Sequence, residues 1–247
     1  MMVGMGHYRW FLCTHWLETH NNGLHSSVIF EQRGELLRLT CEDTASRYHL
    51  PMVTTRLSQW FKIFRRLSIS WVLRDSFWLV IVWGGSVAGA YAGVYPERVA
   101  GLLLVDPSGD STQMPIEEVQ QYIGALESEA YSNVVGGYWS QILTGSAETT
   151  QAKVMQDLRD TPKATVVGVF KELFKYNPVP ALERYDGPKL SVITSINETP
   201  FSVHNLVSKL PHKIITETGH WLQLDKPEEY NQIMDEFLSS VDNGSHI

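Results

Sequence analysis

Residues 83–110 read Trp-Gly-Gly-Ser-Val-Ala-Gly-Ala-Tyr-Ala-Gly-Val-Tyr-Pro-Glu-Arg-Val-Ala-Gly-Leu-Leu-Leu-Val-Asp-Pro-Ser-Gly-Asp. This stretch predicts a helix over about 87–94, which Pro96 stops, and a strand over 101–105. An apolar strand expected at 78–82 precedes the glycine pair, so the three pieces form a strand–helix–strand unit. The unbroken Leu-Leu-Leu-Val run is typical of a parallel strand covered by helices on both faces. The stretch therefore predicts an α/β protein with a mostly parallel central sheet.

Two motifs in this stretch resemble the α/β-hydrolase family. Its nucleophile helix commonly ends in Pro-Glu-Arg-Val, as at 96–99, and the following strand ends in Val-Asp-Pro, as at 105–107. The resemblance covers residues 83–241 and implies a mostly parallel sheet flanked by helices, with a helical cap inserted at about 112–186. We expect a single domain over residues 1–247.

Composition excludes several classes of function. The 247 residues carry a formal charge of −7, which argues against nucleic acid or anionic membranes as partners. Cys13 and Cys41 cannot form a disulfide framework, and no His/Cys cluster has metal-ligand spacing. No glycine-rich phosphate loop occurs, and the first residues lack the basic region followed by an apolar core that is typical of a secretory signal. We therefore expect a cytoplasmic protein, and the resemblance implies a small-molecule substrate and no cofactor or metal.

Residues 1–82 do not match the family. The resemblance implies a His-Gly loop for the oxyanion hole and an Asp-Leu-Arg-Gly-His-Gly loop, and neither is present. Short strands are expected only at 28–30 and 36–37. Residues 61–71 predict a basic amphipathic helix, for which an ordinary surface helix is the favoured interpretation.

A shifted reading frame would account for this mismatch. Taking the third base of each codon with the first two of the next, residues 40–45 permit Leu-Arg-Gly-His-Gly and residues 4–6 permit His-Gly. Residues 79–83 permit Gly-His-Ser directly before Gly84-Gly85. Each match is weak alone, but the three lie in family order at family-like spacing. We hypothesise that residues 1 to about 82 are a frame-shifted α/β-hydrolase N-terminus.

The segment after Asp106 predicts a helical layer. Apolar residues recur at three-four spacing, with helix-start signals at Ser146 and Thr161. Helices are expected at 116–126, 131–143, 147–158 and 162–174. Caps in the family line the substrate site with apolar and aromatic residues, which makes Tyr138, Trp139, Phe170 and Phe174 candidates. For each of them, ordinary packing within a helical layer is the favoured interpretation.

His220 is the strongest single candidate for chemistry. Strands are expected at 188–195 and 213–216, and the second leads into Thr218-Gly219-His220-Trp221, followed by a closing amphipathic helix at 227–241. A histidine in a glycine-preceded loop after a late strand lies where the family places its general base. The resemblance therefore implies that His220 transfers protons.

Two positions in the sequence are candidates for the nucleophile. Ser86 follows Gly84-Gly85 and offers a hydroxyl near a strand-to-helix turn, as acyl transfer requires. Spacing to the Pro-Glu-Arg-Val motif, counted on the family's Gly-His-Ser-x-Gly-Gly pattern, instead places the nucleophile at Val82, which cannot attack a carbonyl. Val82 is the favoured structural equivalent, and Ser86 then becomes a small helix residue packed on the sheet.

Candidates for the acid that orients His220 lie after two strands. Asp106 ends the strand after the nucleophile helix, a position that some family members use, and Asp110 lies in the loop beyond it. Asn197 and Glu198 follow the next-to-last strand, where most members place the acid. Asn197 carries no charge, which favours Asp106, although Val-Asp-Pro also recurs in relatives as a simple strand-end turn.

The resemblance implies a function and leaves an alternative. The family hydrolyses esters or related acyl bonds by serine attack, and here we expect a small, largely apolar substrate. The alternative is a catalytically inactive relative with Val82 at the nucleophile position, acting as a binding or interaction protein or arising from the shifted frame.

Overall fold

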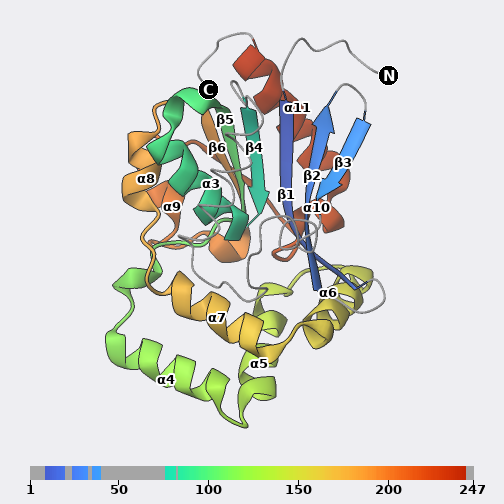
Figure 1. Cartoon of the computed structure of the whole chain (residues 1–247), viewed down its shortest axis with the longest axis vertical. Helices are drawn as coiled ribbons and strands as arrows, with labels where there is room; N and C mark the ends of the chain where they lie inside the picture. Colours follow the sequence, from blue (N-terminus) through green and yellow to red (C-terminus); the bar gives the residue numbers. More distant parts are fainter. Residues whose placement is uncertain (1–8, 20–23, 33–34, 40–75, 82, 243–247) are drawn as a thin grey trace.

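The computed structural model of the chain describes residues 9–19, 24–32, 35–39, 76–81 and 83–242 (Figure 1). Within them, the strands form one seven-stranded sheet with the order β3-β2-β1-β4-β5-β6-β7. The strands are β1 (Arg9–Thr19), β2 (Leu24–Gln32), β3 (Glu35–Leu39), β4 (Ser76–Ile81), β5 (Val99–Val105), β6 (Lys189–Thr194) and β7 (His212–Ile215).

Most of the sheet is parallel. β1 pairs in parallel with β4, β4 with β5, β5 with β6 and β6 with β7, whereas β2 and β3 add an antiparallel edge. The mostly parallel sheet predicted from the apolar run of β5 is therefore confirmed.

The strands before β4 test the interpretation of the N-terminal part. β2 and β3 contain the strands predicted at 28–30 and 36–37. The strand β1 was not predicted, and it pairs with β2 on one side and β4 on the other. A strand inside a sheet has both faces available for covering elements, so its sequence need not alternate between apolar and polar residues. The helix predicted at 61–71 lies outside the described residues.

Helices cover both faces of β5. Leu102 and Leu104 pack in one core with Tyr91 of α3 (Trp83–Val94), and this core also contains Leu182 of α8 (Val179–Arg184). Leu103 and Val105 point to the opposite face, where they pack with Phe237 of α11 (Pro227–Asp242). These four residues of β5 are at most 2% exposed, which explains why the Leu-Leu-Leu-Val run is apolar throughout.

The helix α3 differs in detail from its prediction. It begins at Trp83 rather than at about residue 87, so the glycine pair lies in its first turn. Gly89 and Gly93 face α8, where Leu182 and Ala181 are their nearest neighbours. The small residues of α3 therefore permit close packing of α8 as well as of the sheet.

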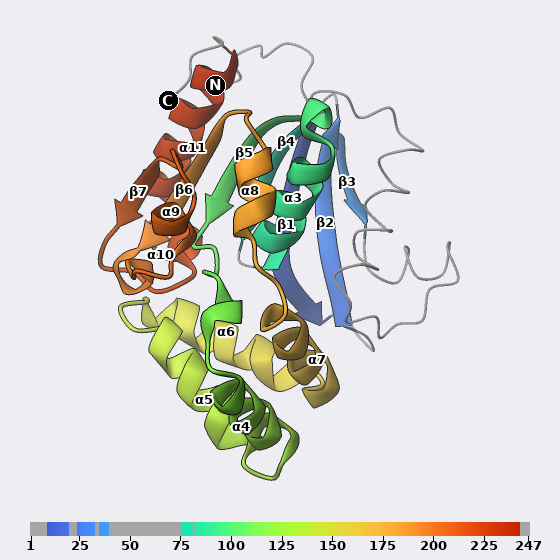
Figure 2. The same ribbon diagram turned by 90° about the vertical axis from the view of Figure 1, so that its left-hand side faces the viewer.

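Four helices between β5 and β6 form what we call the helical insertion. They are α4 (Ile116–Glu127), α5 (Tyr131–Ile142), α6 (Glu148–Asp160) and α7 (Lys163–Leu173). Figure 2 shows them beyond the carboxyl ends of the strands, where they pack around a core of their own that includes Leu126, Val135 and Phe170. The predicted N-caps were wrong by one residue, because Ala147 and Pro162, not Ser146 and Thr161, occupy these positions without a side-chain cap.

The chain after the insertion returns to the sheet as predicted. The segments expected at 188–195, 213–216 and 227–241 correspond to β6, β7 and α11. Two short helices, α9 (Val203–Leu206) and α10 (Leu222–Asp225), lie between them. No helix in the described part of the chain is long and apolar enough to cross a membrane.

Candidate active site

The carboxyl ends of three neighbouring strands place the candidate residues. Asp106 directly follows β5, Thr194 is the last residue of β6, and His220 lies in the loop after β7. The backbone N–H of Asp106 continues the ladder by donating to the Val192 carbonyl at 2.7 Å. Because adjacent parallel strands end at the same edge, residues more than eighty positions apart in the sequence meet here.

Asp106 and His220 form a buried pair. Nδ1 of His220 is hydrogen-bonded to Oδ2 of Asp106, and the two side chains are only 12% and 6% exposed. The other carboxylate oxygen, Oδ1, accepts from Thr194 N at 2.8 Å, Thr194 Oγ1 at 3.1 Å and Asn197 Nδ2 at 3.2 Å. Asp106 is thus held by four hydrogen bonds, which fix the direction in which it faces the imidazole.

The backbone of Asp106 also contributes to this arrangement. Its φ is 43°, in the left-handed region that aspartate tolerates better than most residues. This conformation turns the chain away from β5 directly after the strand. On the other side of the pair, the Trp221 ring packs edge-on against the His220 ring, with centroids 5.0 Å apart. Both members of the pair are therefore constrained by their own surroundings.

The charge state of the pair follows from its contacts. Burial alone would raise the pKa of Asp106, but the hydrogen bond and charge of His220, with the donors of Thr194 and Asn197, lower it below its ordinary value. Asp106 is therefore ionised at neutral pH. An ionised carboxylate at Nδ1 favours the tautomer with its proton on Nδ1, so that the Nε2 lone pair of a neutral His220 is free to accept a proton.

The other acid candidates do not contact His220. Asp110 accepts hydrogen bonds from Thr112 N and Gln113 Nε2, both at 3.1 Å, and so caps a short 3-10 helix. Glu198 is exposed and makes no hydrogen bond or ion pair with His220 among the described residues. Asn197, at the usual acid position, donates to Asp106 instead. The structure brings only Asp106 of these candidates to the histidine.

Ser86 lies apart from this hydrogen-bond network. It occupies the first turn of α3 and is 6% exposed. Within the described part of the chain, no hydrogen bond joins Ser86 to His220 or to Asp106. Val82, the alternative nucleophile position, lies outside the described residues. The identity of the nucleophile stays a prediction.

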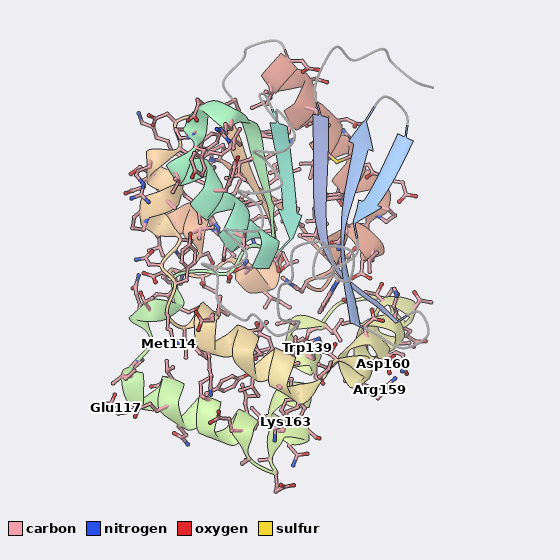
Figure 3. The ribbon with its side chains drawn as sticks, viewed as in Figure 1. Met114, Glu117, Trp139, Arg159, Asp160 and Lys163 are labelled. Carbon is pink, nitrogen blue, oxygen red and sulfur yellow. The ribbon has the colours of Figure 1, made fainter. Side chains whose placement is uncertain are left out.

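The aromatic candidates of the helical insertion divide into two kinds. Phe170 is 5% exposed and belongs to the core of the insertion, and Trp139 and Phe174 pack against that core as partly buried residues. Figure 3 labels Trp139 among the helices of the insertion. Tyr138 is 36% exposed and packs edge-on against Phe170. Burial of its hydroxyl raises the pKa of Tyr138, and the negative charge of Asp106 raises it further. Tyr138 is the only one of the four candidates with a hydroxyl, and the charge of Asp106 acts on it.

Sequence reasoning missed Thr194, which supplies two of the donors to Asp106. The register of the sheet could have indicated it, because Thr194 ends β6, the strand beside β5. It lies two residues beyond Val192, which is the register partner of Val105.

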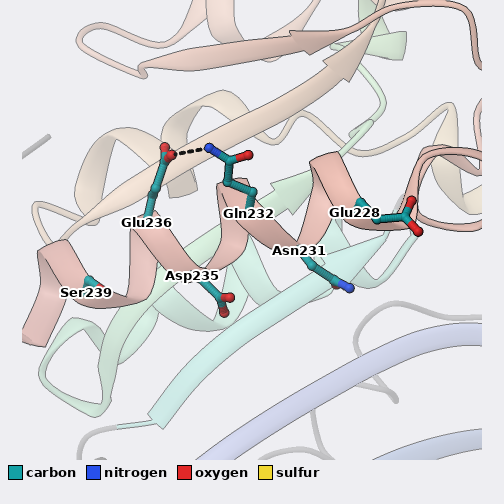
Figure 4. Close-up of a pocket in the computed structure, with 6 residues that line it drawn as sticks. All are labelled: Glu228, Asn231, Gln232, Asp235, Glu236 and Ser239. Atoms are coloured by element: carbon teal, nitrogen blue, oxygen red, sulfur yellow. Dashed lines mark hydrogen bonds between the residues drawn. The ribbon is translucent and has the colours of Figure 1, made fainter. Parts of the chain in front are cut away.

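An open depression on α11 lies apart from the candidate site (Figure 4). It is lined by polar side chains only, namely Glu228, Asn231, Gln232, Asp235, Glu236 and Ser239, and includes none of the candidate residues.

Comparisons with known proteins agree with this architecture. No protein-family model and no curated protein sequence matches the chain. Among solved structures, it resembles an esterase from Exiguobacterium antarcticum, with a TM-score of 0.65 and 14% identity, over 77% of this chain and 76% of that one. It also resembles the N-acyl homoserine lactone degrading enzyme Est816, with a TM-score of 0.62 and 19% identity, over 76% of each chain.

A third similar structure is the bromoperoxidase from Bacillus anthracis, with a TM-score of 0.62 and 12% identity over 76% of each chain. The parallel sheet, the helices on both faces and the insertion beyond the strand ends define an α/β fold. The chain has the α/β-hydrolase fold, as its sequence motifs predicted.

Proposed function

We propose that the chain hydrolyses an ester or related acyl bond in a small, largely apolar molecule. The observation that carries this proposal is the buried hydrogen bond between His220 Nδ1 and the Asp106 carboxylate. Solved structures similar to the chain include esterases and a lactone-degrading enzyme, which fits an acyl substrate.

In this proposal, His220 is the general base. Its Nε2 atom takes the proton of the attacking hydroxyl and then gives it to the leaving group. Asp106 holds the imidazole in one tautomer and stabilises the imidazolium that forms. The fixed carboxylate, held by Thr194 and Asn197, needs no reorganisation during this step.

Ser86 is the proposed nucleophile, because it is the serine that follows the glycine pair in the first turn of α3. Attack by its Oγ atom on the acyl carbon would expel the alcohol and leave an acyl-enzyme, which water then hydrolyses. This role requires Ser86 Oγ to come within about 2.6–3.2 Å of His220 Nε2 when substrate is bound.

A fluorophosphonate probe tests this proposal directly. We expect the parent protein to carry the adduct on Ser86, and the adduct to disappear in Ser86→Ala and in His220→Ala. Peptide mass spectrometry identifies the labelled residue. An unlabelled parent that also fails to hydrolyse p-nitrophenyl butyrate would contradict the proposal.

A second candidate function follows from the absence of a hydrogen bond between Ser86 and His220 among the described residues. In that case the chain is an inactive relative that keeps the acid–histidine pair and lacks a nucleophile, with Val82 at its position. The variant Val82→Ser separates the two functions. A new adduct on residue 82 of the variant, with none on the parent, would favour the inactive relative.

A further inference from the structure

The loop that carries His220 is in backbone contact with the helical insertion. The backbone N–H of His220 donates to the carbonyl oxygen of Ile142 at 2.8 Å, and Ile142 is the last residue of α5. At Gly219, an added Cβ would lie 2.2 Å from Ser146 Oγ and 2.9 Å from the Ile142 oxygen. Gly145, with a φ of 88°, faces Thr218 in the same way. The two backbones therefore meet with no space for a side chain between them.

Asp225, at the end of α10, joins these two segments through its carboxylate. Oδ1 accepts from Ala147 N in the insertion at 3.1 Å. Oδ2 accepts from Thr218 Oγ1 at 2.8 Å and from Gly219 N at 3.3 Å, both in the His220 loop. One side chain thus bonds to the insertion with one oxygen and to the loop with the other.

The position of this carboxylate is also electrostatically favourable. Ala147 precedes α6 and makes no side-chain cap of its own, so Asp225 supplies negative charge near the N-terminus of a 13-residue helix. Burial raises the pKa of Asp225, but the hydroxyl groups of Thr150, Thr218 and Ser146 and the backbone N–H of Ala147 lower it below its ordinary value. The carboxylate is therefore ionised at neutral pH and can accept these hydrogen bonds.

We propose that Asp225 is a positioning residue for His220, which couples the docking of the helical insertion to the orientation of the imidazole towards Asp106. The insertion and the histidine loop then move as one unit. This inference extends the proposed function, since it assigns to the insertion a role in holding the general base, beyond covering the substrate.

Two variants weaken the connection between the insertion and the His220 loop, one by a change in the insertion and the other by a change at Asp225. Ala147→Pro removes the backbone N–H that bonds to Asp225 from the insertion and leaves the hydroxyls of Thr150 and Ser146 in place, and the φ of Ala147, −60°, is one that proline adopts. Asp225→Ala removes the carboxylate and with it every hydrogen bond that it accepts from either segment. Asp225→Glu keeps the charge, and Asp235→Asn changes an exposed carboxylate on α11 as the matched control.

The measurement follows the proton between His220 Nδ1 and Asp106 by its far-downfield proton resonance, recorded on the full chain below the unfolding midpoint of each variant. We expect this proton to exchange with water about tenfold faster in Asp225→Ala and in Ala147→Pro than in the parent. Asp235→Asn should behave as the parent does, and Asp225→Glu should lie closer to the parent than Asp225→Ala.

The outcomes separate this inference from the proposed function, because the resonance is read without substrate. A parent that lacks the resonance, or an Ala147→Pro variant with unchanged exchange, would overturn the coupling. A chain that shows the expected exchange rates but hydrolyses no ester would leave the coupling in place and overturn only the hydrolase function. In an active chain, we further expect Ala147→Pro to lower kcat more than it changes KM.

Discussion

The side-chain amide of Asn197 donates to Oδ1 of Asp106 at 3.2 Å and to the Pro107 carbonyl at 2.8 Å. Asn197 lies at the position where most α/β-hydrolases are expected to carry their acid. In this chain, the residue at that position supports a carboxylate that follows the neighbouring strand. The charged residue here directly follows β5, and a neutral donor follows β6.

This relationship predicts the effect of Asn197→Asp. The substitution replaces a donor to Asp106 by a second carboxylate in a buried site, so the two acids repel each other and one of them takes up a proton. We expect the variant to unfold at lower temperature at pH 7 than at pH 5, because protonation relieves the repulsion. Melting followed by circular dichroism at the two pH values measures this. Asn197→Ala should show no such dependence, and an identical pH response of the two variants would contradict the prediction.

A second prediction concerns the acid stability that Asp106 contributes. Its pKa in the folded protein is below the ordinary value of 3.8, so the unfolded chain binds more protons near that pH and the stability rises with pH. The contribution is complete above pH 3.8 and is lost as the pH falls through the lower folded pKa. We expect Asp106→Asn to be less stable than the parent at pH 7 and to lose less stability on acidification.

Urea unfolding of the two proteins from pH 7 down to pH 3 checks this. Asp235→Asn, at an exposed position on α11, is the control and should follow the parent across the whole range. Parallel stability curves for Asp106→Asn and the parent would show that the Asp106 carboxylate gains nothing from its four donors.

The helices and strands that could be predicted are those that a short stretch of their own sequence specifies. The unbroken apolar run of β5, the stop at Pro96 and the three-four spacing of α4 to α7 each specify an element without knowledge of its neighbours. The strand β1 could not be recognised in this way, because its place depends on pairing with β4, more than sixty residues away. The N-cap of α6 was displaced by one residue, since Ala147 N bonds to Asp225, which is distant in sequence.

The residues of the candidate site could likewise be predicted from local sequence, whereas the contacts between them could not. The glycine-preceded loop after a strand marked His220, and the motif at the end of β5 marked Asp106. Their hydrogen bond depends on the parallel register of β5, β6 and β7, which only the folded sheet provides. The roles of Asn197 and Thr194 as donors to the acid could not be inferred either, because an amide and a hydroxyl at a strand end are common without any function.

A third prediction concerns the coding DNA of residues 1–82. If this part is frame-shifted, the other frame should encode His-Gly at residues 4–6, Leu-Arg-Gly-His-Gly at 40–45 and Gly-His-Ser at 79–83. The last of these motifs would place a serine at the position that Val82 occupies in the present frame. Sequencing the gene decides the matter, and a shifted frame that is interrupted by stop codons or lacks these motifs would refute the hypothesis.

The last prediction tests whether the close approach of the insertion to the His220 loop contributes to stability. In Gly219→Ala, the new methyl group would lie 2.9 Å from the Ile142 carbonyl oxygen, a backbone atom that cannot rotate away. We expect a loss of about 1–3 kcal/mol in the free energy of unfolding, as for overpacking elsewhere. Urea unfolding monitored by tryptophan fluorescence measures it.

Gly137→Ala is the matched control, because Gly137 lies within α5 and an added Cβ there has no atom within 4 Å. Alanine is the better helix former, so this variant should be more stable than the parent by up to about 1 kcal/mol. The two substitutions add the same methyl group and are expected to change stability in opposite directions. If Gly219→Ala were as stable as Gly137→Ala, the loop and the insertion would be separated by more space than their backbone hydrogen bond allows, and the coupling through Asp225 would lose its structural basis.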